Sequence, residues 1–473
     1  MEQIKLSWKT KFGYGLCTCA DSVPYNLFYI YFIYFLTDIV GVQPVLAGLI
    51  SFIALAWDAL TDPVVGGMSD NYVTEKGRRL PWMKRSVLPL AVVVYLMFAP
   101  FEIESVAAQS IYYIIVAMLV WLFYTTFLVP YFAMGAELTA DYDERNLLRF
   151  MTMFIAYPIL LLVSSGPMWI WAWAENAGYS DRAAWGYTGT VFALLLLLLC
   201  CSGMFLIRDC EKNVIKAALE AQKNRVKQNF YKIWKDCLSI KCFRRIVVWI
   251  LIYMLGFSML NTVLVYIMTY NAGMDHVQQA VFWTVYVVIV VCTLPITTFF
   301  CNKFGKKPTM LVVMTPAIVS SLIFFFVGIN SVPAMYVFAT LSVIGSSAFF
   351  TFYVGYAYDC IEIDEFLTGE RKEGSMTALS TFAQKFGSAL ALYFTGWVLG
   401  FTGYDGMADV QTAEALKGVL SLGTLFPAIL SLIALGILAT YPVSKQKFAL
   451  LCAALEKKKA GEEYSTDGFA DIL

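Results

Sequence analysis

Twelve stretches of this chain are each apolar enough, and long enough, to cross about 30 Å of hydrocarbon, which takes roughly 20 residues of helix. The chain is 59% hydrophobic and only 14% charged over 473 residues. No water reaches the backbone of such spans, so their polar groups must pair within each helix. The sequence therefore predicts an all-α polytopic membrane protein with helices at 12–37, 45–71, 82–101, 109–138, 149–175, 184–207, 243–271, 277–301, 308–330, 333–360, 375–403 and 413–441.

The basic residues predict the orientation of these helices, and an even number of spans puts both termini on one side. Eleven lysines and arginines lie between 208 and 245, five more lie in the loop 72–85, and others precede the first helix. The opposite loops offer Arg182 and Lys417. By the positive-inside rule both termini are cytoplasmic, in a cell inner or plasma membrane. The first ten residues lack the features of a signal peptide, so we expect the first helix to insert uncleaved.

A polar, charged stretch at 209–242 divides the predicted helices into two sets of six. We expect an N-terminal bundle at 1–208, a cytoplasmic central loop at 209–242, and a C-terminal bundle at 243–443. The last segment, 444–473, is charged, and we expect a mobile cytoplasmic tail there.

A weak internal repeat supports this division. The motif GRRLP at 77–81 recurs as GKKP at 305–308, and the pair Glu144-Arg145 recurs as Glu370-Arg371. Both recurrences are offset by about 227 residues (305−77 and 370−144). Two parallel six-helix halves, with substrate held between them near the middle of the membrane, are typical of the major facilitator fold.

Two carboxylates lie inside the second predicted helix, at Asp58 and Asp62. An aspartate at the centre of a spanning helix costs roughly 2.5 to 3.5 kcal/mol, so such residues usually face a cavity and belong to an ion or substrate path. A spacing of four places both on one helix face. Pro63 has no N–H for the carbonyl of Ala59, which leaves that oxygen unpaired beside them. We interpret this segment as a candidate cation site.

Two further charged residues reach a similar depth. Counted from the cytoplasmic ends of their helices, Asp21 lies about nine residues along the first helix and Lys385 about ten along the eleventh. The acids exceed the base, and in a low-dielectric site that excess requires a bound cation or a proton. Oxygen ligands suit Na⁺, and Thr61 supplies one. An alternative is a fixed bridge between Asp58 and Lys385 with no ion.

Other residues carry weaker signals. Tyr25 and Tyr29 continue the face of Asp21, where they could contact a sugar, although aromatic faces also pack against lipid. His276 is alone in an outer loop, where we expect it to be solvated. No nucleophile with a paired base, phosphate loop or metal-ligand spacing occurs, so we expect neither an enzyme nor a cofactor other than the coupling ion. The basic residues are not interleaved with stacking aromatics, so we expect no nucleic-acid partner.

Several motifs resemble those of the glycoside-pentoside-hexuronide:cation symporters, the family that includes melibiose permease. The similarity extends along the whole chain and is carried by WDALTDP at 57–63, GRRLPW at 77–82, ELTADYDER at 137–145, NKFGKKP at 302–308, and YDCIEIDEFLTGERKEG followed later by QKFGSAL. It implies cation ligands at Asp58, Asp62, Thr61 and Thr125, with Na⁺ possible at the two carboxylates. It also implies a coupling role for Lys385, with Thr381 one turn before it, and sugar binding by Asp21.

The chain also departs from this family. The permease's second sugar-binding acid falls at Leu128, and its two pocket tryptophans fall at Phe132 and Phe350. Its helix-five arginine falls at Arg149 if a gap is allowed, and at Thr152 otherwise. These changes favour a glycoside other than a galactoside, or one that carries its own carboxylate near an arginine.

We therefore predict a monomeric secondary active transporter in the lipid bilayer. It would move a glycoside, oligosaccharide, pentoside or hexuronide together with Na⁺ or H⁺ by alternating access. The alternatives are a uniporter or lysolipid carrier on the same fold and, less favoured, a membrane-embedded enzyme or sensor.

Overall fold

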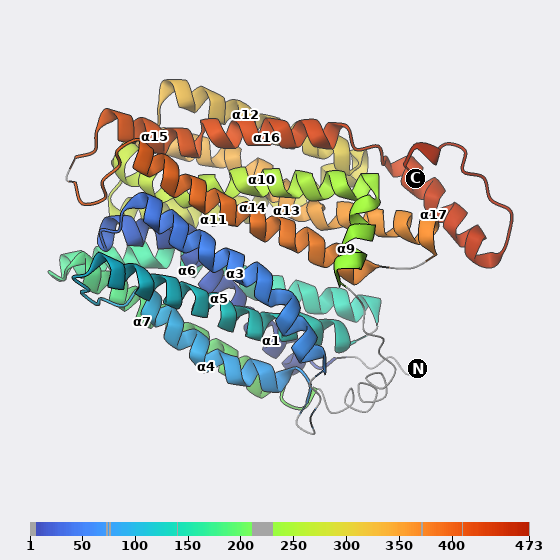
Figure 1. The fold of residues 1–473 in the computed structure, drawn as a ribbon, viewed down its shortest axis with the longest axis horizontal. Helices are drawn as coiled ribbons and strands as arrows, with labels where there is room; N and C mark the ends of the chain where they lie inside the picture. The colour runs from blue at the N-terminus through green and yellow to red at the C-terminus, as the bar shows by residue number, and fades with distance from the viewer. Residues whose placement is uncertain are drawn as a thin grey trace.

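The computed structural model describes residues 6–71, 74, 77–139, 141–210, 230–369, 372–408 and 410–472, and this part of the chain is helical with no β-strand. The long helices run side by side in one elongated bundle (Figure 1). Their bounds are α3 (Pro44–Asn71), α4 (Leu80–Met97), α5 (Val106–Glu137), α6 (Tyr142–Asn176), α7 (Asp181–Leu206), α10 (Lys241–Tyr266), α11 (His276–Phe304), α12 (Lys306–Val327), α13 (Val332–Thr368), α14 (Glu373–Phe401), α15 (Ala413–Gly423) and α16 (Leu425–Ala439).

Ten helical stretches in the described residues are long and apolar enough to cross a membrane, with α15 and α16 counted as one. The other two of the twelve predicted spans are α14, which packs between α3 and α10, and the first span. The first span is divided into α1 (Trp8–Leu16), α2 (Cys19–Leu27) and two π-helical turns, η1 (Phe28–Phe32) and η2 (Phe35–Ile39). π-Turns recur at functional sites, and this span lines the cavity described below.

Several helix ends differ from the predicted ones. α6 begins at Tyr142 and α13 continues to Thr368, so both extend well past their apolar windows. Charged residues that lie beyond the hydrocarbon do not stop a helix, and hydropathy alone cannot detect such extensions. The last span, predicted as one helix, is interrupted at Thr424, where the backbone leaves helical geometry between α15 and α16.

The helices form two groups, α1–α7 and α10–α16, which meet along two seams. α3 packs against α14 at one seam, and α6 packs against α11 at the other. In Figure 1 the first group lies below the second, and α17 (Lys445–Ala460) lies at the right-hand end beside the label for the C-terminus, with the label for the N-terminus lower down at the same end. We call this end the terminus end of the bundle, and the other the opposite end.

The repeat predicted from GRRLP and GKKP corresponds to two similar ion pairs. In the first group Arg79, directly before α4, lies 2.8 Å from a carboxylate oxygen of Glu137 at the end of α5. In the second group Lys306, the first residue of α12, lies 2.8 Å from Asp359 in α13. In each half an ion pair therefore links the segment after the second span, α3 or α11, to the fourth span, α5 or α13.

Part of the predicted central loop, 211–229, lies outside the described residues. The remainder contains a short helix, α9 (Phe230–Ser239).

The prediction of a mobile tail is wrong. α17 packs against α13 through Leu451 and Leu455, both buried, and Lys459 forms an ion pair of 2.6 Å with Glu365. The apolar run FALLCAAL at 448–455 lies between lysine- and glutamate-rich flanks, and these charges dominate the composition of the tail.

Candidate functional site

The largest cavity described here lies between the two groups of helices and has a volume of about 630 Å³. Both groups contribute to its walls, the first through α2, α3, α5 and α6 and the second through α10, α11, α13 and α14. Nine of the predicted site residues line it, namely Asp21, Tyr25, Tyr29, Asp62, Thr125, Phe132, Phe350, Thr381 and Lys385. Residues that were singled out from five separate predicted spans are therefore brought together.

Lys385 joins the two predicted cation-site carboxylates across the seam between α3 and α14. Its ammonium lies 2.5 Å from Asp62 Oδ2 and 2.7 Å from Asp58 Oδ2. Asp58 is fully buried, whereas Asp62 keeps 25% of its side chain exposed and faces the cavity. The expectation that these charges reach the same depth is confirmed.

Thr125 on α5 completes this cluster. Its hydroxyl lies 2.6 Å from Asp58 Oδ1 and 3.0 Å from Asp62 Oδ1, so one buried hydroxyl contacts both carboxylates and its single proton can be donated to either. Thr61 is also buried, but its hydroxyl donates to the backbone carbonyl of Asp58 at 3.1 Å and it does not line the cavity. Thr381 lines the cavity, and its hydroxyl donates to the carbonyl of Thr377 one turn earlier.

Asp21 lies in the first turn of α2 and accepts a hydrogen bond of 2.7 Å from the Tyr124 hydroxyl. Tyr124 also presents its ring to Lys385, whose ammonium lies 5.9 Å from the ring centroid. One tyrosine therefore links the predicted sugar-binding acid to the ion cluster. No sequence pattern indicated this role, because Tyr124 is one of 28 tyrosines and directly precedes Thr125, the residue that the resemblance selected.

The rings of Tyr25 and Tyr29 lie 4.4 Å apart and form one aromatic face on the cavity wall. Trp121 supports this face from behind, with its ring edge-on to both tyrosines. Tyr25 and Tyr29 thus line the cavity instead of facing lipid, and their contact with a sugar stays a prediction.

Neither candidate for the helix-five substrate position lines the cavity. Arg149 is exposed near the start of α6, and Thr152 donates its hydroxyl to the carbonyl of Leu148 in its own helix. Leu128 does line the cavity, at the position where the related permease carries an acid. The described walls therefore hold Asp21 and Asp62 as acids and Lys385 as base.

The second half contributes polar cavity residues that the sequence reading missed, among them Asn261 on α10, Trp283 on α11 and Gln384 on α14. A polar residue within an apolar span is a signal that could have drawn attention to Asn261. Gln384 could have been found from its position next to Lys385. Trp283 had no such signal, because aromatic residues are abundant throughout the chain.

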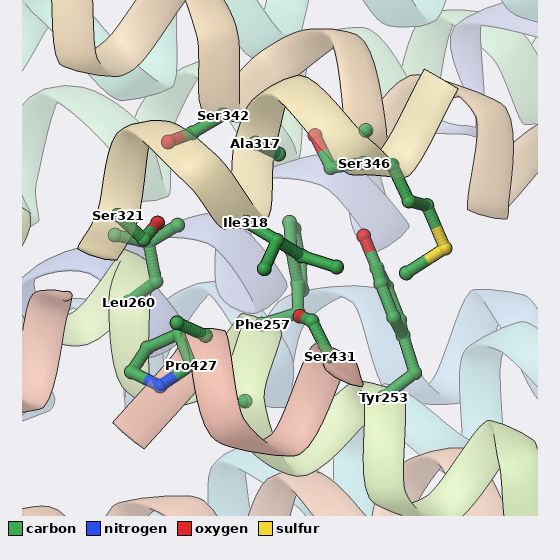
Figure 2. Close-up of a pocket in the computed structure, with 14 residues that line it drawn as sticks. Tyr253, Phe257, Leu260, Ala317, Ile318, Ser321, Ser342, Ser346, Pro427 and Ser431 are labelled. Atoms are coloured by element: carbon green, nitrogen blue, oxygen red, sulfur yellow. The ribbon is translucent and has the colours of Figure 1, made fainter. Parts of the chain in front are cut away.

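A second cavity, of about 40 Å³, lies within the second half between α10, α12, α13 and α16 (Figure 2). Its walls are mostly apolar and include Ser342, whose buried hydroxyl has no hydrogen-bond partner among the described residues. Phe257 and Ser346 line both cavities. The smaller one has room for a few water molecules and not for a sugar ring.

Hydrogen bonds close the opposite end of the bundle across the two halves. The hydroxyls of Tyr270 and Tyr404 each lie 2.5 Å from the same oxygen of Asp38, and Thr37 bonds Tyr266 at 2.7 Å. Toward the terminus end, by contrast, Phe132 lines the cavity and is 56% exposed, only five residues before α5 ends. The cavity is therefore closed at the opposite end and extends toward the terminus end.

His276 also joins the two halves at this end. Its side chain is 22% exposed, so it keeps contact with solvent as predicted, but it is not alone. Its imidazole stacks on Trp171 at 4.0 Å and lies 3.1 Å from a carboxylate oxygen of Glu175 on α6. The interaction joins residues 101 positions apart, which local sequence context cannot show.

Among the described residues no group of three or more histidine, cysteine, aspartate or glutamate side chains is placed to hold a metal ion. The oxygen atoms of the predicted cation site are those of two carboxylates and the Thr125 hydroxyl, and oxygen ligands suit hard cations.

The sequence profile of the family described as "MFS/sugar transport protein" matches residues 13–445. The chain belongs to this family. It is 24% identical to a glucuronide carrier protein homolog of Escherichia coli, with 96% of this chain and 97% of the relative covered. It is 25% identical to an isoprimeverose transporter of Lactiplantibacillus pentosus, with 97% and 94% covered.

The fold is similar to solved transporters of the same superfamily. A D-xylose–proton symporter aligns with a TM-score of 0.57 and 15% identity over 93% of this chain and 96% of its own. The nucleoside transporter NupG aligns with a TM-score of 0.63 and 13% identity over 92% and 99%. The predicted major facilitator fold is confirmed, and the protein is a multi-pass membrane protein.

Proposed function

We propose that the protein carries a sugar across the membrane together with Na⁺ or H⁺, by alternating access of its two halves. The observation that supports this most directly is the position of Lys385. This side chain comes from the second half and forms ion pairs with two carboxylates of the first, at the wall of a cavity that both halves build. Movement of the halves relative to one another must therefore change the charge balance of the site.

The charge balance indicates how coupling would work. Two carboxylates and one ammonium leave one negative charge, and in a low-dielectric site a monovalent cation or a proton compensates it. Asp58, Asp62 and Thr125 would supply the oxygens, with Thr61 adjacent to them. Ion binding would then compete with Lys385 for the carboxylates and loosen the tie between α3 and α14.

The sugar would lie beside this cluster. Asp21 can accept hydrogen bonds from ring hydroxyls, and the face formed by Tyr25 and Tyr29 can stack against a pyranose ring. Phe132 and Phe350 add apolar surface where the related permease has tryptophans. Because Arg149 does not line the cavity, we assign it no contact with substrate in this conformation.

The proposal also includes an orientation, based on the positive-inside rule, and an assembly state. We assign the terminus end to the cytoplasm of a cell inner or plasma membrane, so that the structure is inward-facing, and we propose a monomer as the transporting unit. The only cofactor in this proposal is the coupling ion.

The test is uptake by proteoliposomes that contain purified protein. Wild type should accumulate at least one labelled glycoside or pentoside in response to an imposed Na⁺ or H⁺ gradient. Asp58→Asn and Asp62→Asn should insert normally and lose this accumulation, whereas Asp467→Asn in the exposed tail should keep it. Full gradient-driven uptake by both variants contradicts the cation site, and uptake that ignores both gradients indicates a uniporter.

A further inference from the structure

A third cavity lies at the terminus end of the second half and has a volume of about 250 Å³. It shares none of its described lining residues with the central cavity. Its walls come from the turn between α11 and α12, from α13, and from the start of α17. Of the described residues that line it, three are lysines, Lys306, Lys307 and Lys445, and one is an acid, Asp359. The lining therefore carries an excess of positive charge.

The acid is fully engaged by one of the three lysines. The ammonium of Lys306 lies 2.8 and 2.9 Å from the two carboxylate oxygens of Asp359. It also donates to the carbonyl of Gly355 at 2.9 Å. An ammonium has three donors, so Lys306 has none left for a ligand.

The other two lysines have no carboxylate partner among the described residues. Lys307 donates to the carbonyls of Ala439 and Tyr441, at 2.7 and 2.9 Å. Lys445 donates to the carbonyl of Asn302 at 3.2 Å. These carbonyls hold the ammonium groups in place without neutralising their charge, and one N–H of Lys307 and two of Lys445 stay available to a ligand.

The corresponding segment of the first half is paired differently. Both bases of the GRRLP motif, Arg78 and Arg79, form ion pairs with Glu137, at 3.4 and 2.8 Å. In the GKKP motif of the second half, Lys306 has a carboxylate partner and Lys307 has none among the described residues. The uncompensated charge is therefore a property of the second half and not of the repeat as such.

Two helix N-termini meet the same cavity. α12 begins at Lys306, directly after Gly305, and no side chain caps it. α17 begins at Lys445, and its capping residue Ser444 accepts a hydrogen bond from the backbone of Lys447. First-turn N–H groups have no partner within a helix, and the helix dipole favours an anion beside them. Both helix starts therefore reinforce the attraction of the lysines for a negative group.

Apolar surface adjoins the cavity. Phe448 lines it, and Phe299, Phe300 and Phe304 are exposed in the last two turns of α11, which also supply the lining residue Cys301. Exposed apolar side chains near the end of a membrane-spanning helix contact acyl chains, so the lysines beside them reach the depth of the lipid head groups. Basic pockets between helices at this depth bind phosphate-bearing head groups.

We propose that this cavity binds a phosphate group, which the ammonium groups of Lys307 and Lys445 contact at the starts of α12 and α17. The phosphate belongs to the head group of an anionic phospholipid or to a soluble phosphate, and the same charge-assisted hydrogen bonds serve either source. A bound phosphate links α12 to α17 and so holds the tail helix on the second half. The site is separate from the sugar and ion sites, so its test does not depend on transport.

The test uses purified full-length protein in detergent and two measurements. Native mass spectrometry measures the binding of dioleoylphosphatidylglycerol, with zwitterionic dioleoylphosphatidylcholine as the comparison. Wild type should bind the anionic lipid with a dissociation constant at least tenfold lower. The melting temperature is measured in inorganic phosphate and in chloride at equal ionic strength. Because phosphate stabilises proteins in general, the informative quantity is the difference in this shift between wild type and a variant.

The double variant Lys307→Gln, Lys445→Gln removes both ammonium groups and keeps polar side chains of similar length. It should bind phosphatidylglycerol at least tenfold more weakly than wild type, or show a smaller phosphate-dependent shift in melting temperature. The matched control is Lys303→Gln, Lys457→Gln. It loses the same two charges from α11 and α17, but these two lysines are exposed and do not line the cavity. The control should behave as wild type in both measurements.

Lys307 also contacts the end of α16, so Lys445→Gln alone is the milder variant if the double variant does not fold. It should change the same quantity in the same direction. A loss confined to phosphatidylglycerol binding identifies a lipid as the source, and a loss confined to the phosphate-dependent shift identifies a soluble phosphate. If the cavity variants match the control in both measurements, the site is overturned. The same follows if wild type neither prefers phosphatidylglycerol nor responds to phosphate more than the cavity variants do.

Discussion

The ammonium of Lys385 on α14 lies 2.5 Å from a carboxylate oxygen of Asp62 on α3, and this contact ties the two halves together at the wall of the central cavity. Asp58 shares the same ammonium at 2.7 Å. A permanent bridge and a coupling switch both fit this geometry, and they differ in what happens when the lysine is removed.

Lys385→Ala should increase the apparent affinity for the coupling ion at least tenfold while the rank order of transported sugars stays the same. Without the ammonium, the two carboxylates repel one another and attract a cation more strongly; one charge at about 4 Å is worth roughly 4 kcal/mol at an effective dielectric of 20. Uptake measured against Na⁺ concentration and against pH gives the comparison. Unaltered ion dependence would support a permanent bridge.

Thr125→Val should lower the apparent affinity for Na⁺, the opposite of the change expected for Lys385→Ala. The substitution preserves side-chain volume but removes a hydroxyl that contacts both Asp58 and Asp62. Hydrogen bonds to charged groups contribute about 1.5–3 kcal/mol, so for Na⁺ coupling, in which the hydroxyl would be an ion ligand, we expect the half-saturation concentration of Na⁺ to rise at least tenfold. For H⁺ coupling the opposite change is expected, because a carboxylate that loses this donor binds its proton more tightly. Thr126→Val is the control, since its hydroxyl donates only within α5, to the carbonyl of Phe123. Equal ion affinity in both variants would exclude Thr125 from the site.

Closure of the opposite end depends on Asp38, which accepts two tyrosine hydroxyls from the second half. The double variant Tyr270→Phe, Tyr404→Phe should shift the protein toward the conformation open at that end, because both charge-assisted hydrogen bonds are lost. A cysteine placed at the cavity by Ile30→Cys reports this shift. Its modification by a membrane-impermeant thiol reagent from that side should be at least tenfold faster in the double variant than in Ile30→Cys alone. Equal rates would show that these bonds do not hold the closed state.

The sequence was sufficient to predict the helices and the charged cluster, because both predictions depend only on hydropathy and on residue spacing within single helices. Residue counts from the helix ends placed Asp58, Asp62 and Lys385 at one depth, since an α-helix rises by a fixed amount per residue. The contacts of Tyr124 with Asp21 and of His276 with Glu175 depend instead on how distant helices pack. Neither hydropathy nor spacing contains that information.

The tail shows a second limit of sequence reading. Its composition predicts mobility, yet Leu451 and Leu455 are buried against the second half. A helix with few apolar residues can still dock if those residues share one face and a partner surface is available. Only the folded structure supplies that surface.

The charges on the cavity wall predict which sugars are excluded. Asp21 and Asp62 line the described cavity, and the ammonium of Lys385 is already shared by Asp58 and Asp62. The carboxylate of a hexuronide would therefore meet negative charge without a compensating cation among the described lining residues, and a buried, unpaired carboxylate is costly.

A matched pair of probes, 4-nitrophenyl β-D-glucoside and 4-nitrophenyl β-D-glucuronide, differs only in whether carbon six is a hydroxymethyl group or a carboxylate. We expect uptake of the glucuronide to be at least tenfold less efficient, measured as the ratio of kcat/KM in proteoliposomes. If neither probe is transported, inhibition of an accepted substrate gives the same comparison. Equal or preferred transport of the glucuronide would contradict the charge argument. It would require a cation such as Arg149 to move to the cavity wall. In that case Arg149→Gln should cause a selective loss of glucuronide transport.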